Sequence, residues 1–293
     1  MSISQSSKVS VALIQMACSA DPAKNLRVAL DRIHTAAKSG AKLVCLPELF
    51  RSLYFCQKED YACFHLAETI PGPTSQALSL AAKKHKITLV ASLFEKRTEG
   101  LYHNTAVVFG PNGKTLGTYR KMHIPDDPGF SEKFYFSPGD TGFHPIDTPV
   151  GRLGILVCWD QWYPEAARLM ALRGAQILIY PTAIGWAKGE TKAVCDAQQN
   201  AWQTIQRSHA IANGLYVLSI NRTGCEKNLQ FWGSSFAAAR FGQVIAQSPS
   251  HKAEILKTTL DLSKIASTRQ HWPFLRDRRV DAYAGLDQRF LTS

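Results

Sequence analysis

The sequence contains no run of about 18 consecutive apolar residues, the length that a membrane-spanning helix needs. Its N-terminus has one short apolar stretch, which Gln15 interrupts and Asp21 follows, a pattern typical of a first β-strand rather than of a signal peptide. Low-complexity tracts are also missing, and 45% of the 293 residues are hydrophobic. These features exclude a disordered or collagenous chain and predict a globular cytoplasmic protein without membrane contact.

The sequence has no CxxC pair among its seven cysteines. An odd number of cysteines in a chain without an export signal argues against a disulfide framework. Cys56, Cys63 and His65 lie close together, but their spacing matches no zinc signature. We therefore expect mostly buried free thiols and no metal cofactor.

Acidic residues are relatively few, 23 against 34 lysines and arginines, so the formal net charge is +11. The basic residues are nevertheless spread along the chain, and no zinc-finger, RNA-recognition or basic-zipper pattern is found. Solvated surface charge explains this excess, and we predict no nucleic-acid partner.

Short apolar runs alternate with helical patterns, which favours an α/β fold. Helices are expected after Asp21-Pro22 and over 73–86, 164–173 and 198–213, and antiparallel hairpins over 105–119 and 234–245, so the sheets should be mixed. The expected buried strands are Val11–Met16, Leu43–Leu46, Ile87–Phe94, Thr105–Phe109, Leu153–Cys158, Ile177–Tyr180 and Leu215–Ile220. No linker divides the chain, so residues 1–293 are expected to form one domain. Residues 264–293 form an arginine- and aromatic-rich tail that we expect to pack on a surface or a partner.

Three places combine a reactive side chain with the end of an expected element. Glu48 follows the run Leu43–Leu46, where ligands bind in α/β folds. Cys158 ends a strand just before a helix that begins with proline, and backbone N–H groups of such a turn can stabilise an oxyanion. Lys121 follows the first hairpin and could face a developing anion.

Each residue alone has an ordinary structural explanation: an exposed strand end, a buried thiol or a solvated lysine. Together they form a complete set for acyl transfer at a C–N bond. A free thiol is only a few per cent thiolate at neutral pH, so Cys158 needs a base, which Glu48 can provide. The ammonium of Lys121 can then stabilise the tetrahedral oxyanion.

The segments around these residues resemble the nitrilase (carbon–nitrogen hydrolase) superfamily over essentially the whole chain. The similarity rests on PELF at 47–50, YRKMHIP at 119–125 and CWDQWYPEAARLMALRGAQILIYPTAIG at 158–185. It implies a four-layer α-β-β-α sandwich with two mixed sheets, paired into a homodimer or larger assembly through a helical face and the tail.

The resemblance also implies a role for each site residue. Cys158 would be the nucleophile, Glu48 the general base and Lys121 the oxyanion ligand, assisted by the backbone N–H of Trp159. Glu132 matches a second glutamate that lies beside the lysine in many members. No organic cofactor or metal would be required.

The segments YFCQ at 54–57, HIPDDPGFSEKFYFSPGDTGF at 123–143 and FLRDRR at 274–279 resemble the N-carbamoylputrescine amidohydrolase branch of the superfamily. The implied reaction releases putrescine, carbon dioxide and ammonia, as in polyamine biosynthesis. Asp126, Asp160 and Glu190 are then candidates to bind the distal ammonium of the substrate. The loop from Trp186 to Glu190 departs from the Ser-Glu-Pro pattern of that branch, so it is expected to line the pocket mouth and to alter substrate choice.

Two alternatives remain open. A related hydrolase would act on an ω-amide or an N-carbamoyl amino acid, whose carboxylate Arg207 or Arg222 could bind. A protein of another class, a basic binding protein, would keep Cys158 for structural reasons alone; a Cys158→Ala variant would retain its binding activity.

Overall fold

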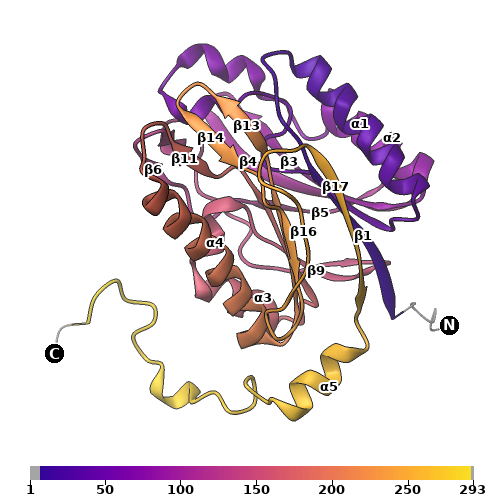
Figure 1. Cartoon of the computed structure of the whole chain (residues 1–293), viewed down its shortest axis with the longest axis vertical. Coiled ribbons are helices and arrows are strands. Elements are labelled where there is room, and N and C mark those ends of the chain that lie inside the picture. Colours follow the sequence, from indigo (N-terminus) through magenta and orange to yellow (C-terminus); the bar gives the residue numbers. More distant parts are fainter. Residues whose placement is uncertain (1–6, 292–293) are drawn as a thin grey trace.

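The computed structural model describes residues 7–291, and within them two six-stranded sheets lie between pairs of helices (Figure 1). The first sheet has the order β17-β1-β2-β3-β4-β5. Its strands are Lys8–Gln15 (β1), Leu43–Cys45 (β2), Thr88–Thr98 (β3), Leu101–Phe109 (β4), Thr115–Arg120 (β5) and Glu254–Asp261 (β17). Strands β1, β2 and β3 are parallel, and the outer pairings are antiparallel.

The second sheet has the order β16-β15-β12-β10-β9-β8. Its strands are Ile146–Thr148 (β8), Gly151–Ile155 (β9), Ile177–Thr182 (β10), Tyr216–Asn221 (β12), Phe236–Ala238 (β15) and Val244–Gln247 (β16). Strands β9, β10 and β12 are parallel, and the other pairings are antiparallel. Two small sheets are formed by Gly185–Ala187 (β11), Thr223–Glu226 (β13) and Leu229–Trp232 (β14), and by Asp126–Asp127 (β6) and Phe130–Ser131 (β7).

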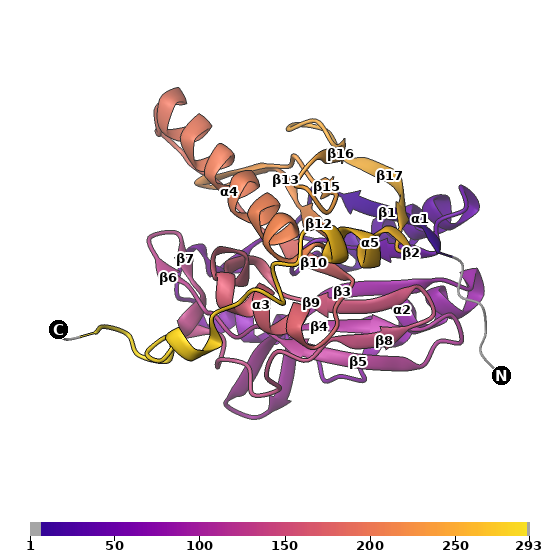
Figure 2. The same ribbon diagram turned by 90° about the horizontal axis from the view of Figure 1, so that it is seen from below.

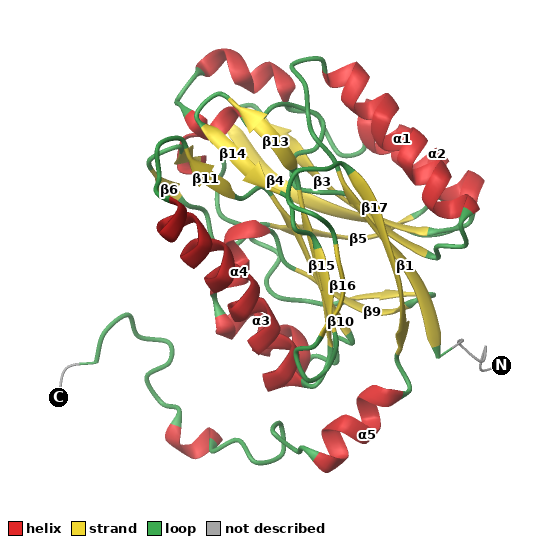
Figure 3. Cartoon of the chain, in the orientation of Figure 1, coloured by secondary structure: helices red, strands yellow, loops and turns green. Residues whose placement is uncertain are grey.

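Helices cover the outer faces of both sheets (Figure 3). The α-helices are Pro22–Lys38 (α1), Pro73–His85 (α2), Pro164–Leu172 (α3), Lys192–Asn213 (α4) and Lys264–His271 (α5). Short 3₁₀ turns are Phe55–Gln57 (η1), Tyr61–Leu66 (η2), Glu132–Phe134 (η3), Cys158–Trp162 (η4) and Val280–Ala282 (η5).

Helix α1 shows how local sequence sets an element. The Asp21 side chain accepts hydrogen bonds from the N–H groups of Ala23 and Lys24, and Pro22 occupies the first helical position. Ala29 and Ile33 face inward, where α1 and α2 pack on one face of the first sheet.

One hydrophobic core lies between the first sheet and helices α1 and α2. A second hydrophobic core lies between the two sheets and continues under α3 and α4. It joins apolar residues of β1 and β4, such as Val11 and Val108, to residues of the second sheet, such as Ile155 and Ile179. Strand β10 is buried along its whole length, as expected of a strand covered on both faces. The α-β-β-α sandwich with two mixed sheets is thereby confirmed.

Several elements differ from the expectation, and strand β9 ends at Ile155, whereas the expected strand extended to Cys158. Helix α4 begins at Lys192 instead of 198, because Thr191 caps it through a hydrogen bond from the N–H of Val194. Strand β17, which is not among the expected strands, pairs along the whole of β1. No helix within residues 7–291 is both long and apolar enough to cross a membrane.

The C-terminal tail follows α5 along the lower edge of the molecule and passes near α3 (Figures 1 and 2). Ile265 is buried, and Arg269 donates to the carbonyls of Asn213 and Ala175, so α5 is anchored to the body. Beyond it, large apolar side chains are exposed, among them Leu286 and Phe290.

Candidate active site

Glu48 lies just beyond the carboxyl end of β2 and is fully buried. One carboxylate oxygen, Oε1, accepts from Asn104 Nδ2 at 2.7 Å and from Lys121 Nζ at 2.9 Å. The other, Oε2, is equally buried and has no partner among the described residues. Buried polar atoms normally have partners, so this oxygen is available to a reacting group.

Lys121 follows the last residue of β5 at the same edge of the first sheet and is buried. Its ammonium donates to Glu132 Oε2 at 2.6 Å as well as to Glu48. Glu132, in η3, in turn accepts from the Tyr54 hydroxyl at 2.7 Å. The lysine is therefore clamped between two carboxylates, and its position is defined on both sides.

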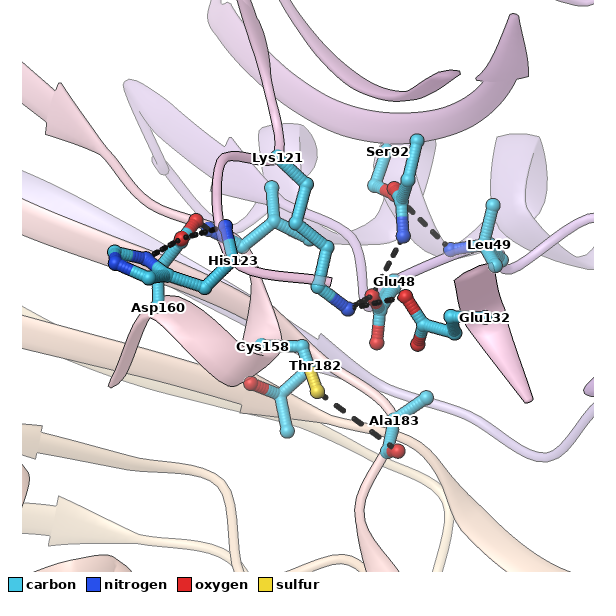
Figure 4. Close-up of polar contacts among 12 residues, drawn as sticks. Glu48, Leu49, Ser92, Lys121, His123, Glu132, Cys158, Asp160, Thr182 and Ala183 are labelled. Carbon is cyan, nitrogen blue, oxygen red and sulfur yellow. Dashed lines mark hydrogen bonds and ion pairs between the residues drawn. The ribbon is translucent and has the colours of Figure 1, made fainter. Parts of the chain in front are cut away.

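Cys158 is the first residue of η4, and Leu156 and Val157 separate it from the carboxyl end of β9 at Ile155. Its φ of +46° places a non-glycine residue in the left-handed region, a strain found at strand-to-helix turns that expose a nucleophile. The sulfur lies 4.0 Å from the carbonyl oxygen of Ala183. Figure 4 shows the side-chain ends of Glu48, Lys121 and Glu132 converging, with the Cys158 sulfur beside them.

Burial and charge set the protonation of this cluster. Burial, with Glu48 nearby, raises the pKa of the Cys158 thiol well above its usual range despite Lys121. Burial lowers the pKa of Lys121, but Glu132 and Glu48 outweigh it and hold that pKa well above its usual range. Burial also raises the pKa of Glu132 to about 7, against the pull of Lys121. The resting site thus holds a neutral thiol beside a lysine ammonium.

Asp160 is completely buried and does not line the cavity above Cys158. Its oxygens accept from the Tyr119 hydroxyl at 2.8 Å, the Val157 N–H at 2.8 Å and the His123 N–H at 3.0 Å, and one lies 2.6 Å from His123 Nδ1. This carboxylate therefore joins the nucleophile turn to the segment after Lys121. Because protein donors occupy its oxygens and it does not line the cavity, Asp160 is not placed to bind a substrate ammonium.

A cavity of about 390 Å³ opens above Cys158, within the usual size range for small-molecule sites. Trp159 lies on its wall, and as the second residue of η4 it has an N–H in the first turn of that helix, where such groups lack intrahelical partners. The described lining residues with charged side chains are Asp127 and Glu190.

The other expected substrate-binding residues lie elsewhere. Asp126 is exposed and does not line the cavity, whereas its neighbour Asp127 does. Trp186 is also outside the lining, and its indole N–H donates to the Cys195 carbonyl at 2.9 Å. The loop that Trp186 begins still reaches the cavity through Glu190.

The arginines expected to bind a substrate carboxylate are used within the protein. Arg207 donates through Nε to the Gly242 carbonyl at 2.7 Å. Arg222 is buried and pairs with Glu226 at 3.0 Å. Neither lines the cavity.

Sequence reasoning missed Tyr54, Asn104 and Asp127. Tyr54 lies in the YFCQ segment, but its contact with Glu132 and that of Asn104 with Glu48 join residues distant in sequence, so no local pattern indicates these contacts. Asp127 adjoins the expected Asp126, and although both are exposed in the β6–β7 hairpin, only Asp127 lines the cavity. Within residues 7–291, no group of three or more His, Cys, Asp or Glu side chains is arranged to hold a metal ion.

Several known proteins have sequences similar to that of this chain. The chain is 41% identical to the citrullinase of Francisella tularensis over 280 residues, covering 94% of this chain and 96% of that protein. It is 39% identical to the N-carbamoylputrescine amidase of Solanum lycopersicum over 284 residues, covering 94% and 93%.

A comparison with solved structures agrees with the sequence similarities. The crystal structure of a carbon–nitrogen hydrolase from Helicobacter pylori G27 superposes with a TM-score of 0.95 at 47% identity, covering 97% of this chain and all of that one. The carbon–nitrogen hydrolase model matches residues 10–270, well over half of the sequence. The chain therefore belongs to the carbon–nitrogen hydrolase family.

Proposed function

We propose that the protein is a cysteine-dependent amidohydrolase for N-carbamoyl amines, with N-carbamoylputrescine as its substrate. The observation that carries this proposal is the buried cluster of Glu48, Lys121 and Cys158 beneath a cavity whose charged lining residues are acids. The family assignment favours this reading over a basic binding protein with a structural cysteine.

In the first half of the reaction, the Cys158 sulfur attacks the carbamoyl carbon while Glu48 takes the thiol proton. The unpartnered Oε2 of Glu48 suits this transfer. Lys121 and the Trp159 N–H stabilise the tetrahedral oxyanion, a contribution worth about 2.7–4 kcal/mol per donor in related chemistry. Glu48 then returns the proton to the leaving nitrogen, ammonia departs, and a thiocarbamate remains on Cys158.

In the second half, Glu48 removes a proton from water, which attacks the thiocarbamate carbon. The C–S bond breaks, Glu48 returns the proton to the sulfur, and the released carbamic acid decomposes to carbon dioxide and the amine. Glu132 holds the Lys121 ammonium in place in both halves. No step requires a metal or organic cofactor.

The cavity supports a substrate with a cationic end. Asp127 and Glu190 can attract the ammonium of N-carbamoylputrescine, and the aromatic walls Trp159, Trp162 and Trp232 suit its methylene chain. Both Glu190 oxygens already accept, from the Ala187 N–H and from Gln198, but each retains a second lone pair. These carboxylates act locally, within a screening length of about 8 Å, against the positive net charge of the molecule.

A second candidate is citrulline, which has the same ureido group and a carboxylate besides its ammonium. One observation favours it: the buried indole N–H groups of Trp162 and Trp232 have no hydrogen-bond partner among residues 7–291, and both residues line the cavity. Each can donate to a carboxylate oxygen. The remaining substrate classes to be compared are a short ω-amide and an N-carbamoyl amino acid such as N-carbamoyl-β-alanine.

We also propose that the protein is cytoplasmic and forms a homodimer or a larger homo-oligomer.

Ammonia release from N-carbamoylputrescine, citrulline, N-carbamoyl-β-alanine and a short ω-amide tests the proposal, with Cys158→Ala as the inactive control. We expect cysteine-dependent release, fastest with N-carbamoylputrescine. Asp127→Asn should raise KM for this substrate about tenfold, equivalent to about 1.4 kcal/mol, and leave KM for uncharged N-carbamoylbutylamine unchanged. Asp126→Asn is the matched control. Preference for citrulline would select the second candidate, and no release from any substrate would contradict both.

A further inference from the structure

A buried ion pair between Arg222 and Glu226 lies behind the active site, at the corner between β12 and β13. Arg222 Nη1 donates to the two Glu226 oxygens at 3.0 and 3.2 Å. Arg222 is completely buried and Glu226 almost so, and the guanidinium lies 5.2 Å from the ring centroid of Phe231. Neither residue lines the substrate cavity.

The arginine holds the turn that carries Glu48. Its Nη2 donates to the carbonyls of Glu48 at 3.0 Å, Leu49 at 2.8 Å and Ser52 at 3.3 Å. Leu49 has a φ of +46°, a left-handed conformation that costs a non-glycine residue roughly 1–2 kcal/mol. The hydrogen bonds from Arg222 therefore help to hold a strained turn in the one conformation that directs the Glu48 carboxylate toward Lys121.

The glutamate of the pair supports the other side of the site. Glu226 Oε2 accepts from the Tyr54 N–H at 2.6 Å. The Tyr54 hydroxyl donates to Glu132, which accepts from Lys121. Lys121 in turn donates to Glu48, so the contacts form a closed circuit of buried groups with the ion pair at its base.

Stability alone does not account for this arrangement. The desolvation of two buried charges offsets most of their attraction, so such a pair is weak evidence for a stabilising role. The other hydrogen bonds of this pair end on the Glu48 turn and on Tyr54. We infer that Arg222 and Glu226 form a positioning pair that sets the distance between the general base and the oxyanion lysine. This inference rests on the proposed function.

Arg222→Lys tests the arginine, because a single ammonium cannot replace a guanidinium that contacts Glu226 and three carbonyls at once. We expect a folded protein whose kcat falls by about 10²-fold while KM changes little, the effect of a small misplacement of catalytic groups. Arg207→Lys is the matched control, since that arginine also donates to a backbone carbonyl but lies outside the site. Unchanged kcat in a folded Arg222→Lys protein would overturn the inference.

Glu226→Gln supplies a second test if Arg222→Lys does not fold. The amide keeps the size of the side chain and one acceptor but removes the charge, so we expect a smaller fall in kcat, about tenfold, again with KM nearly unchanged. A parallel loss of kcat in Glu226→Gln and Arg207→Lys, or a loss that matches the unfolded fraction, would contradict a positioning role.

A substrate-independent measurement separates this inference from the proposed function. The rate at which iodoacetamide alkylates Cys158, followed by peptide mass mapping, reports whether Glu48 can accept the thiol proton. We expect slower alkylation in Arg222→Lys, toward the rate of Glu48→Gln, and wild-type rates in Arg207→Lys. This result would support the positioning pair even if every substrate failed. Wild-type alkylation in Arg222→Lys would overturn it.

Discussion

The raised pKa of Glu132 makes the stability of the fold depend on pH. Burial raises its pKa to about 7, although Lys121 acts in the opposite direction. The folded protein therefore binds more protons at this position than the unfolded chain does between about pH 4.5 and 7. A group of this kind stabilises the fold most at low pH and loses that contribution as pH rises through its folded pKa.

Glu132→Gln, which cannot titrate, is the direct test of this linkage. As pH rises from 5 to 7, the melting temperature of the wild type should fall relative to that of Glu132→Gln, because only the wild type must release the extra proton. Differential scanning calorimetry of both proteins at each pH measures this change. A difference that stays constant, or that moves in favour of the wild type, would show that Glu132 is already ionised at pH 5.

Lys133 offers a check on the same segment. It is exposed and follows Glu132 in η3, so Lys133→Gln should leave the pH dependence of melting unchanged. A comparable shift in that variant would assign the effect to the general charge of the segment.

At the scale of elements, η4 depends on Asp160 as much as on Cys158. This carboxylate binds the start of the turn through the Val157 N–H and binds Tyr119 and His123 from the segment that carries Lys121. The His123 ring also stacks on Tyr163 with centroids 3.8 Å apart. One buried anion thus fixes the nucleophile turn relative to the lysine segment.

Asp160→Asn should therefore weaken the protein by about 1.5–3 kcal/mol, the usual range for hydrogen bonds to a buried charged group. The amide nitrogen cannot accept, so at least one of the present donors loses its partner. Chemical denaturation measures the change in unfolding free energy. Asp126→Asn is the control and should have no effect, because Asp126 is exposed. Equal stability of the two variants would refute the role of Asp160 as a brace.

At the scale of the whole molecule, the tail after α5 has apolar surface without cover in the single chain. Trp272, Leu286 and Phe290 are 55%, 68% and 81% exposed, and exposed apolar patches mark sites of protein–protein contact. A second copy of the chain would cover them in the predicted homo-oligomer.

Removal of residues 272–293 should lower the oligomeric state, because it deletes this apolar surface. Light scattering coupled to size-exclusion chromatography measures the mass in solution. Tyr61→Ser removes an equally exposed aromatic residue outside the tail and should leave the mass unchanged. An unchanged mass after truncation would place the subunit contact elsewhere.

The sequence by itself identified the α/β fold, most strands and helices, and the three residues proposed for catalysis. These features are local: apolar runs bounded by turn residues mark β10, a cap and proline mark α1, and Glu48 and Cys158 each lie three residues beyond the end of a buried strand. Local patterns of this kind are visible in any single sequence because hydrophobic burial and capping act over a few residues.

Only the tertiary structure decided which residues support the catalytic groups. Arg222 reaches the Glu48 carbonyl across 174 positions, and Glu226 reaches the Tyr54 N–H across 172. The tertiary structure also shows that Asp160 binds the nucleophile turn and that Asp127 lines the cavity. Such pairings depend on how distant strands and turns meet in the two packed sheets, and the order of residues along the chain carries no local record of those contacts.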